Sequence, residues 1–159
     1  MNGGKPATAE GRLMPVDITT EMVIRRPIEV VANYAADPSN APVWYANIDS
    51  VQWEGAPVVA QGARVAFVAR FLGRRLAYTY QLVDVEPGAR LVMRTADGPF
   101  PMETTYRWTA IDASSTRMTL RNRGEPVGFS KLVSPILAPA MRRANRKDLA
   151  KLRTILEAS

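Results

Sequence analysis

The 159-residue sequence contains no cysteine and no histidine. Without cysteine, the chain has no disulfide bond, no thiolate nucleophile and no cysteine-ligated zinc or iron–sulfur site. Without histidine, it lacks the most frequent metal ligand and general base, and with them every serine–histidine or cysteine–histidine catalytic pair. We therefore expect no metal and no cofactor, and the catalytic residues of any enzymatic function stay undefined.

Long apolar stretches are also missing. No run approaches the ~18 residues that cross a bilayer, and the start of the chain lacks the apolar core of a signal peptide. Residues 1–14 are small and polar and are expected to be a disordered lead-in. The remainder, residues 15–157, has the size of a single domain, and we expect the protein to be cytoplasmic.

Alternation of apolar and polar residues predicts seven β-strands, at residues 16–25, 50–54, 63–72, 74–86, 89–95, 102–110 and 116–123. Short turn segments such as Pro87–Gly88 join most of them, so the strands form an antiparallel sheet. The strand at 74–86 is ambiguous, because Tyr78 and Tyr80 alternate on one face while Val83 and Val85 lie on the other. A β-bulge in mid-strand would resolve the conflict and is the preferred interpretation.

Three helices are predicted. Two short ones, at 28–36 and 41–46, follow the first strand directly, and a long one ends the chain from Ile136 to Glu157. Pro139 should break or bend the long helix near its start. The helix has an apolar side, and its opposite side carries Arg142, Arg143, Arg146, Lys147, Lys151 and Arg153. About eight apolar groups at roughly 1.5–3 kcal/mol each need a surface to cover them, which the sheet supplies.

The dimensions of these elements predict an internal space. Seven strands spaced ~4.8 Å apart span some 30 Å, whereas one helix is only ~10–12 Å wide. The sheet must therefore curl around the helix, with the two short helices closing one end. The space inside is filled either by bulky side chains or by a ligand.

Large side chains, several with polar tips, gather on the predicted inner faces. Buried Tyr and Trp need hydrogen-bond partners, which points to a pocket, although the rings could instead simply fill the core. The predicted ligand-binding residues are Trp44, Tyr45, Phe67, Phe71, Tyr78, Tyr80, Met93, Tyr106, Trp108, Asn122, Phe129 and Met141. Acidic residues are scarce there. Asp148, near the inner seam of the helix, is the one that could reach inside, and the preferred interpretation is an edge partner of Arg143 or Arg153.

This order of elements resembles the START-like helix-grip superfamily, and within it the polyketide cyclase/dehydrase and lipid-transport-like group of bacterial proteins, of the SRPBCC type. The resemblance is carried by the stretch Ile24–Val31, by Asp37–Pro38 with Trp44 shortly after, and by residues 116–126 before the final helix. It spans residues 15 to 157. It implies an α+β helix-grip fold, in which a seven-stranded curved antiparallel sheet wraps around the C-terminal helix and a hydrophobic ligand lies between them.

Three functions remain open. The first is binding of a hydrophobic small molecule, such as a lipid or a polyketide-like compound. The second is a polyketide aromatase/cyclase, which would depend on orientation by Tyr hydroxyls and Asn122 rather than on proton transfer. The third is an interaction protein that docks through the basic side of the helix on an anionic surface. Nucleic acid is not the expected partner, because no known motif accompanies these cations, and the oligomeric state is undefined.

Overall fold

The computed structural model describes residues 16–71, 73–125 and 134–159. Its elements are β1 (Val16–Ile24), α1 (Ile28–Ala36), the 3-10 helix η1 (Pro38–Asn40), α2 (Ala41–Trp44), β2 (Ile48–Glu54), β3 (Arg64–Phe71), β4 (Arg74–Glu86), β5 (Arg90–Asp97), β6 (Met102–Asp112), β7 (Ser115–Gly124) and α3 (Ser134–Glu157). The predicted lead-in at 1–14 lies outside the described residues, as does Phe129.

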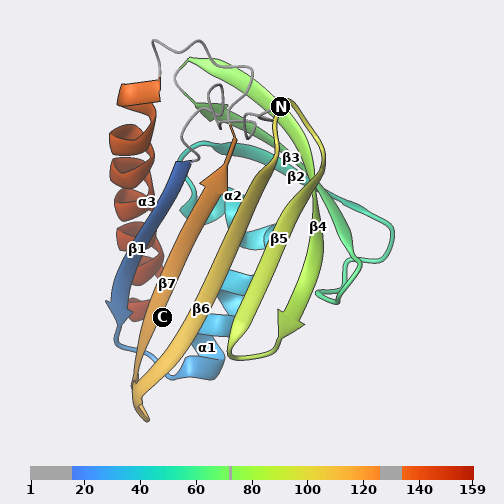
Figure 1. Ribbon diagram of the computed structural model, residues 1–159. Coiled ribbons are helices and arrows are strands. Elements are labelled where there is room, and N and C mark those ends of the chain that lie inside the picture. The colour runs from blue at the N-terminus through green and yellow to red at the C-terminus, as the bar shows by residue number, and fades with distance from the viewer. Residues whose placement is uncertain (1–15, 72, 126–133) are drawn as a thin grey trace, which may run out of the picture.

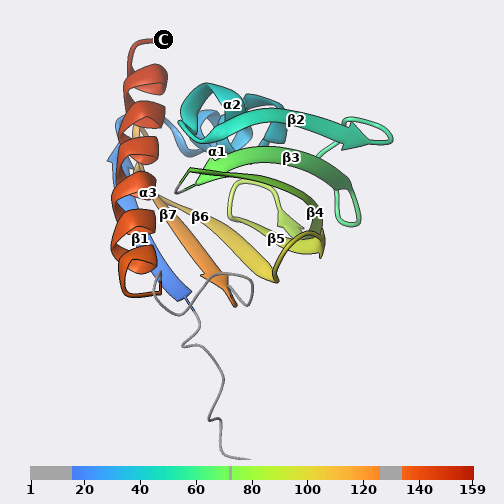
Figure 2. The same cartoon turned by 90° about the horizontal axis from the view of Figure 1, so that it is seen from above.

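The seven strands form one antiparallel sheet in the order β1-β7-β6-β5-β4-β3-β2 (Figure 1). From above, the sheet is strongly curved and α3 lies along β1 at one end of it (Figure 2). In that view α1 and α2 lie between α3 and the β2 edge of the sheet. The helix-grip fold is thus confirmed, with α3 and the two short helices covering the concave side.

The predicted bulge in β4 is present. Pairing between β4 and β5 shifts register between Leu82 and Asp84, and a second shift lies between Thr79 and Tyr80. Tyr80 and Leu82 are buried on the concave side, and Val85 packs against the same core beyond the bulge. An extra residue reverses which side chains face inward, because side chains alternate with a period of two along a strand.

Helix α3 is held at both its apolar side and its end. Leu149 and Leu152 are fully buried against the core. The backbone N–H of Arg25 donates to Glu157 Oε1 at 2.9 Å, so the last turn is tied to the end of β1. The expected break at Pro139 is absent, because the helix is continuous through this residue. The proline ring is on the exposed side of the helix. A carbonyl group that has lost its N–H partner there can bind water instead.

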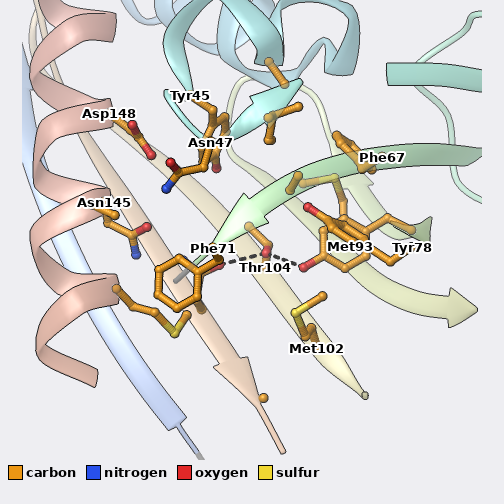
Figure 3. Close-up of a pocket in the computed structure, with 18 of the residues that line it drawn as sticks. Tyr45, Asn47, Phe67, Phe71, Tyr78, Met93, Met102, Thr104, Asn145 and Asp148 are labelled. Carbon is orange, nitrogen blue, oxygen red and sulfur yellow. Dashed lines mark hydrogen bonds between the residues drawn. The ribbon is translucent and has the colours of Figure 1, made fainter. Parts of the chain in front are cut away.

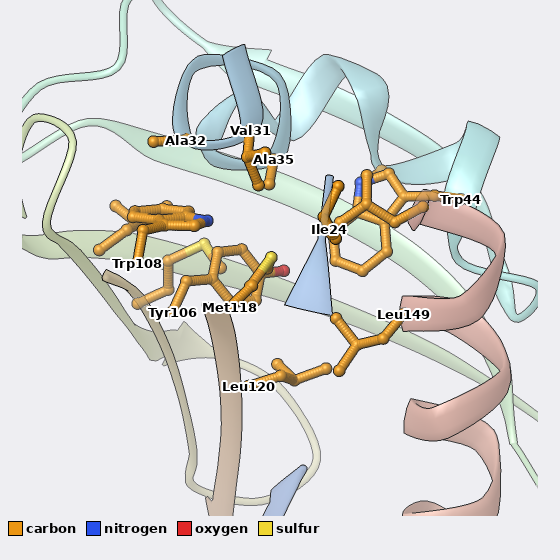
Figure 4. Close-up of a cluster of buried hydrophobic side chains, with 14 of the residues drawn as sticks. Ile24, Val31, Ala32, Ala35, Trp44, Tyr106, Trp108, Met118, Leu120 and Leu149 are labelled. Carbon is orange, nitrogen blue, oxygen red and sulfur yellow. The ribbon is translucent and has the colours of Figure 1, made fainter. Parts of the chain in front are cut away.

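The hydrophobic core lies between α1, α2, α3 and the concave face of β6 and β7 (Figure 4). Trp44 is its largest fully buried side chain and is surrounded by residues such as Ile24 and Leu149. Within the described part of the chain, no helix is both long and apolar enough to cross a membrane.

Candidate functional site: a cavity between the helix and the curved sheet

A cavity of about 160 Å³ lies between α3 and the concave face of the sheet, and it is partly open to solvent. The sheet supplies most of its wall, chiefly through strands β3 to β7, while α1 and α2 border it on one side and the inner side of α3 borders it on the other. Its lining is mainly apolar. Ordered apolar walls with few polar groups are typical of small-molecule sites.

Three aromatic rings on the adjacent strands β3 and β4 line the cavity, and Figure 3 shows two of them, Phe67 and Tyr78, across the cavity from α3. Phe67 on β3 stacks on Tyr78 of β4, with ring centroids 5.4 Å apart and planes 12° apart. Tyr80 meets Tyr78 edge-on at 5.0 Å. These offset and edge-on contacts fix the rings against one another, so the wall is rigid as well as apolar.

The polar tips on this wall satisfy each other. The Thr104 hydroxyl donates to Asn122 Oδ1 at 2.8 Å, and it therefore accepts from the Tyr80 hydroxyl, 3.0 Å away. Burial raises the pKa of Tyr80 to about 12, so the phenol is neutral at physiological pH. The Tyr80–Thr104–Asn122 group is therefore uncharged, and Arg70 on β3 and Arg123 on β7 are the cations that line the cavity among the described residues.

A second pair of phenols lies nearer α3. Tyr45, just after α2, hydrogen-bonds through its hydroxyl to the hydroxyl of Tyr106 on β6. Burial is the main cause that raises the pKa of both residues, so both are neutral. Two hydroxyls that share one hydrogen bond use only one of their two protons. The other proton is available to an acceptor in the cavity.

Asp148 on α3 is the acidic group of the cavity. It is only 3% exposed, and its Oδ1 accepts a hydrogen bond from the Ala46 backbone N–H at 3.1 Å. Burial raises its pKa to about 6, although the Ala46 hydrogen bond and the charges of Lys151 and Lys147 oppose the shift. Its charge in turn raises the pKa of Tyr45 and Tyr106.

The expected ion pair of Asp148 with Arg143 or Arg153 is therefore wrong. Asp148 lies seven residues after Met141 and four after Ala144, and both of these line the cavity. Residues at these spacings share one side of a helix, so Asp148 must point inward with them. That spacing is visible in the sequence and could have placed the carboxyl group in the cavity.

Asn145, one turn before Asp148, also faces the cavity (Figure 3). Its side chain is 6% exposed, and its Nδ2 has no hydrogen-bond partner among the described residues. A buried donor without a partner costs about 1–3 kcal/mol. An acceptor oxygen on a bound molecule, or a bound water, would offset that cost.

The structure places most of the predicted ligand-binding residues at the cavity, and their role in ligand binding stays a prediction. Nine of the predicted residues line the cavity: Tyr45, Phe67, Phe71, Tyr78, Tyr80, Met93, Tyr106, Asn122 and Met141. Trp44 and Trp108 do not line it and belong to the hydrophobic core. Phe129 lies outside the described residues.

Several lining residues were not predicted. Met102 and Thr104 share the face of Tyr106 at two-residue spacing, so strand periodicity could have identified them. Asn145 and Asp148 follow from the helical spacing described above. Asn47 and Phe100 lie outside strands and helices and carry no periodic signal. Among the described residues, no group of three or more acidic side chains is placed to hold a metal ion.

Fold and cavity together define a helix-grip protein with a mainly apolar, partly open cavity between α3 and the sheet. The sequence matches, over residues 15–157, the family described as polyketide cyclase / dehydrase and lipid transport, and the chain belongs to this family. The search of curated proteins gave no match.

Solved structures of similar fold include three from different kinds of organism. The Zhui aromatase/cyclase of Streptomyces sp. R1128 is 16% identical, with a TM-score of 0.77 over 91% of this chain and 94% of that one. A START superfamily protein of Mycobacterium smegmatis is 10% identical, with a TM-score of 0.77 over 89% and 97%. The ginseng major latex-like protein 151 of Panax ginseng is 10% identical, with a TM-score of 0.67 over 88% and 96%. At such identities the likeness concerns the fold alone.

Proposed function

We propose that this protein binds a hydrophobic small molecule in the cavity between α3 and the sheet. The observation that carries the proposal is the unpaired, buried Nδ2 of Asn145 in a mainly apolar, partly open cavity. The indole N–H groups of Trp44 and Trp108 also lack a partner among the described residues, but these two side chains lie in the packed core, whereas Asn145 borders the cavity, where an acceptor can reach it. The ligand is therefore an apolar molecule with an acceptor oxygen, such as a carbonyl or hydroxyl group, directed at α3.

The size of the cavity limits the ligand. A volume of about 160 Å³ is close to that of the roughly 150 Å³ engineered cavity that holds benzene, and it is below the roughly 300–1,000 Å³ of sites for drug-sized ligands. In this conformation the enclosed part of the ligand is about one aromatic ring or a short branched chain. The rest of a longer lipid or polyketide-like molecule extends through the open side.

Filling the cavity tests the proposal. Ala144 lines the cavity on α3, and Ala144→Phe places a ring in the space that the ligand needs. Native mass spectrometry of wild-type protein purified from its host should show retained small-molecule mass. We expect at least a 100-fold loss of affinity for the recovered molecule in the variant, because ring and ligand cannot occupy the same volume.

The matched control is Ala150→Phe, which lies six residues further on the same helix and does not line the cavity. It should bind as the wild type does. Two results together would contradict the proposal. The wild-type protein would carry no small molecule, and Ala144→Phe would leave the affinity for hydrophobic probes unchanged.

A second function, catalysis of polyketide-type cyclisation, is favoured by Asp148. A carboxylate whose pKa is about 6 exchanges protons near physiological pH. It could take a proton from the carbon between two carbonyl groups, while a hydroxyl of the Tyr45–Tyr106 pair donates a hydrogen bond to the enolate oxygen. The enolate carbon would then attack another carbonyl carbon of the same chain, and that oxygen would take up the proton.

The two functions differ in their response to Asp148→Asn. Loss of a general base should lower the rate of cyclisation of a poly-β-ketone thioester by about 10²–10⁴-fold. Affinity for the same compound should change little, because the amide has the size of the carboxyl group. If wild-type protein binds the compound and does not cyclise it, the binding function stands alone.

A further inference from the structure

The exposed side of α3 carries six cations: Arg142, Arg143, Arg146, Lys147, Lys151 and Arg153. We call this set the α3 basic face. The formal net charge of the whole chain is +6, so the remaining fifteen basic residues are balanced by the fifteen acidic ones. The excess positive charge of the protein is therefore concentrated on one side of one helix.

Several basic residues of the sheet are neutralised by acidic neighbours, unlike those of this face. Arg64, Arg94 and Arg121, for example, each form an ion pair with an acidic neighbour, at N–O distances of 3.5, 2.7 and 2.7 Å respectively. In the described part of the chain, no member of the α3 basic face forms an ion pair. Arg153 donates only to the sulfur of Met22, at 3.3 Å.

The two acidic residues in this half of the helix do not neutralise the face. Asp148 is buried on the opposite side, toward the cavity, where Lys147 and Lys151 affect its pKa without forming an ion pair. Glu157 is engaged by the backbone of Arg25. Six like charges along about 17 Å of helix repel one another unless an anionic partner or counterions lie against them.

We propose that the α3 basic face docks on a membrane surface that contains anionic lipid headgroups. Within residues 137–157 of α3, the exposed positions carry no aromatic ring on which a base could stack and no Asn or Gln that could read a base edge. The exposed positions of this range also lack a large apolar side chain, so this part of the helix lies on the headgroups without entering the bilayer. The choice of a lipid surface over nucleic acid rests on the proposed function, because a molecule suited to the apolar cavity partitions into bilayers.

Co-sedimentation with vesicles tests this proposal on the full chain. With 70:30 phosphatidylcholine:phosphatidylserine vesicles at low salt, the wild type should bind, and with pure phosphatidylcholine it should not. Each cation near an anionic surface contributes about fivefold to binding, so Arg142→Gln, Arg143→Gln and Arg146→Gln together should weaken it about 100-fold. Binding should also fall steeply between 50 and 200 mM salt, because the contact is electrostatic.

The matched control removes the same charge from the sheet, through Arg64→Gln, Arg94→Gln and Arg121→Gln, and should weaken vesicle binding less than tenfold. Equal losses in the two triple variants would show a response to net charge and overturn the proposal. Absence of binding by the wild type, or binding to a 20-base-pair duplex at least tenfold tighter than to vesicles at equal phosphate concentration, would also overturn it. The cavity variant Ala144→Phe should bind vesicles normally, which separates this proposal from the proposed ligand function.

Discussion

Replacing Trp44 with alanine is expected to lower the free energy of unfolding by about 3–5 kcal/mol, as for other fully buried aromatic residues. Trp44 is 0% exposed, and its ring packs against Tyr45 at a centroid distance of 4.0 Å and against Tyr106 at 5.9 Å. Its indole N–H has no hydrogen-bond partner among the described residues. The residue therefore stabilises the fold through packing, and alanine leaves a cavity in place of the ring.

Thermal and urea unfolding measure this effect. At roughly 2–4 °C per kcal/mol for a chain of this length, the melting temperature should fall by about 6–20 °C. Trp53→Ala is the matched control, because Trp53 is only partly buried on β2 and donates its N–H to Ser39 Oγ at 2.9 Å. Trp53→Ala should lower the free energy of unfolding clearly less than Trp44→Ala does. A loss below 1 kcal/mol for Trp44→Ala would show that the core is not packed around this ring.

Trp44→Ala should also change the shape of the cavity. Tyr45 and Tyr106 line it, and the ring of Trp44 lies behind both of them. Once that support is gone, the two phenols can move into the space left behind. Affinity for the cavity ligand is thus expected to fall together with stability, although Trp44 itself does not line the cavity.

Asp148→Asn is expected to stabilise the protein at pH 8 by up to about 3 kcal/mol. The pKa of Asp148 is raised from 3.8 to about 6, so the folded state binds the proton more tightly than the unfolded state does. The contribution of Asp148 to stability is then largest below pH ~4 and is lost as the pH rises through the interval from ~4 to ~6. Asparagine keeps the acceptor for the Ala46 N–H and never carries the charge, so it avoids this loss.

The measurement is the free energy of unfolding in urea at pH 4 and pH 8 for both proteins. The free energies of unfolding of wild type and Asp148→Asn should agree at pH 4, and at pH 8 that of the variant should be higher. Asp17→Asn serves as a control of opposite sign, because the hydrogen bond from Arg121 lowers the pKa of Asp17. That pair is exposed, so its loss should destabilise only slightly at pH 8. A variant Asp148→Asn less stable than wild type at pH 8 would contradict the burial of a charged group.

A gain in stability on removing a buried charge bears on function. Residues that cost stability at a cavity are typical of functional sites, where the charge is retained for its chemistry. If Asp148→Asn is more stable and at the same time slower in catalysis or weaker in ligand binding, the carboxyl group serves the cavity rather than the fold.

Most of the fold could be predicted from the sequence because its signals are local. Alternation along residues 102–110 and 116–123 predicted β6 and β7 nearly to their ends, and the clash of faces in residues 74–86 predicted the bulge in β4. Of the break or bend expected at Pro139, the break is wrong, because the helix continues through this residue with the ring on the exposed side of α3, and the bend stays a prediction.

The residues of the candidate site were harder to predict from the sequence. Trp44 and Tyr45 are neighbours of similar type, yet one is enclosed by the core and the other borders the cavity. No pattern along the chain separates them, since the difference depends on which residues from β6 and α3 lie opposite. Asp148 was misplaced for another reason: an acidic residue among cations suggests an ion pair at the surface, although its helical spacing from Met141 indicates the interior.

By itself, the sequence determined the strands, the helices, their order and the sides that turn inward, because backbone periodicity and hydrophobic burial act through neighbours along the chain. It also determined that the excess positive charge lies on one side of the last helix. Only the tertiary structure decided where the interior is packed and where it stays hollow, and that an unpaired amide and a carboxyl group with a raised pKa face the hollow part. Those properties arise from groups that are distant in the chain and adjacent in space, which no local pattern records.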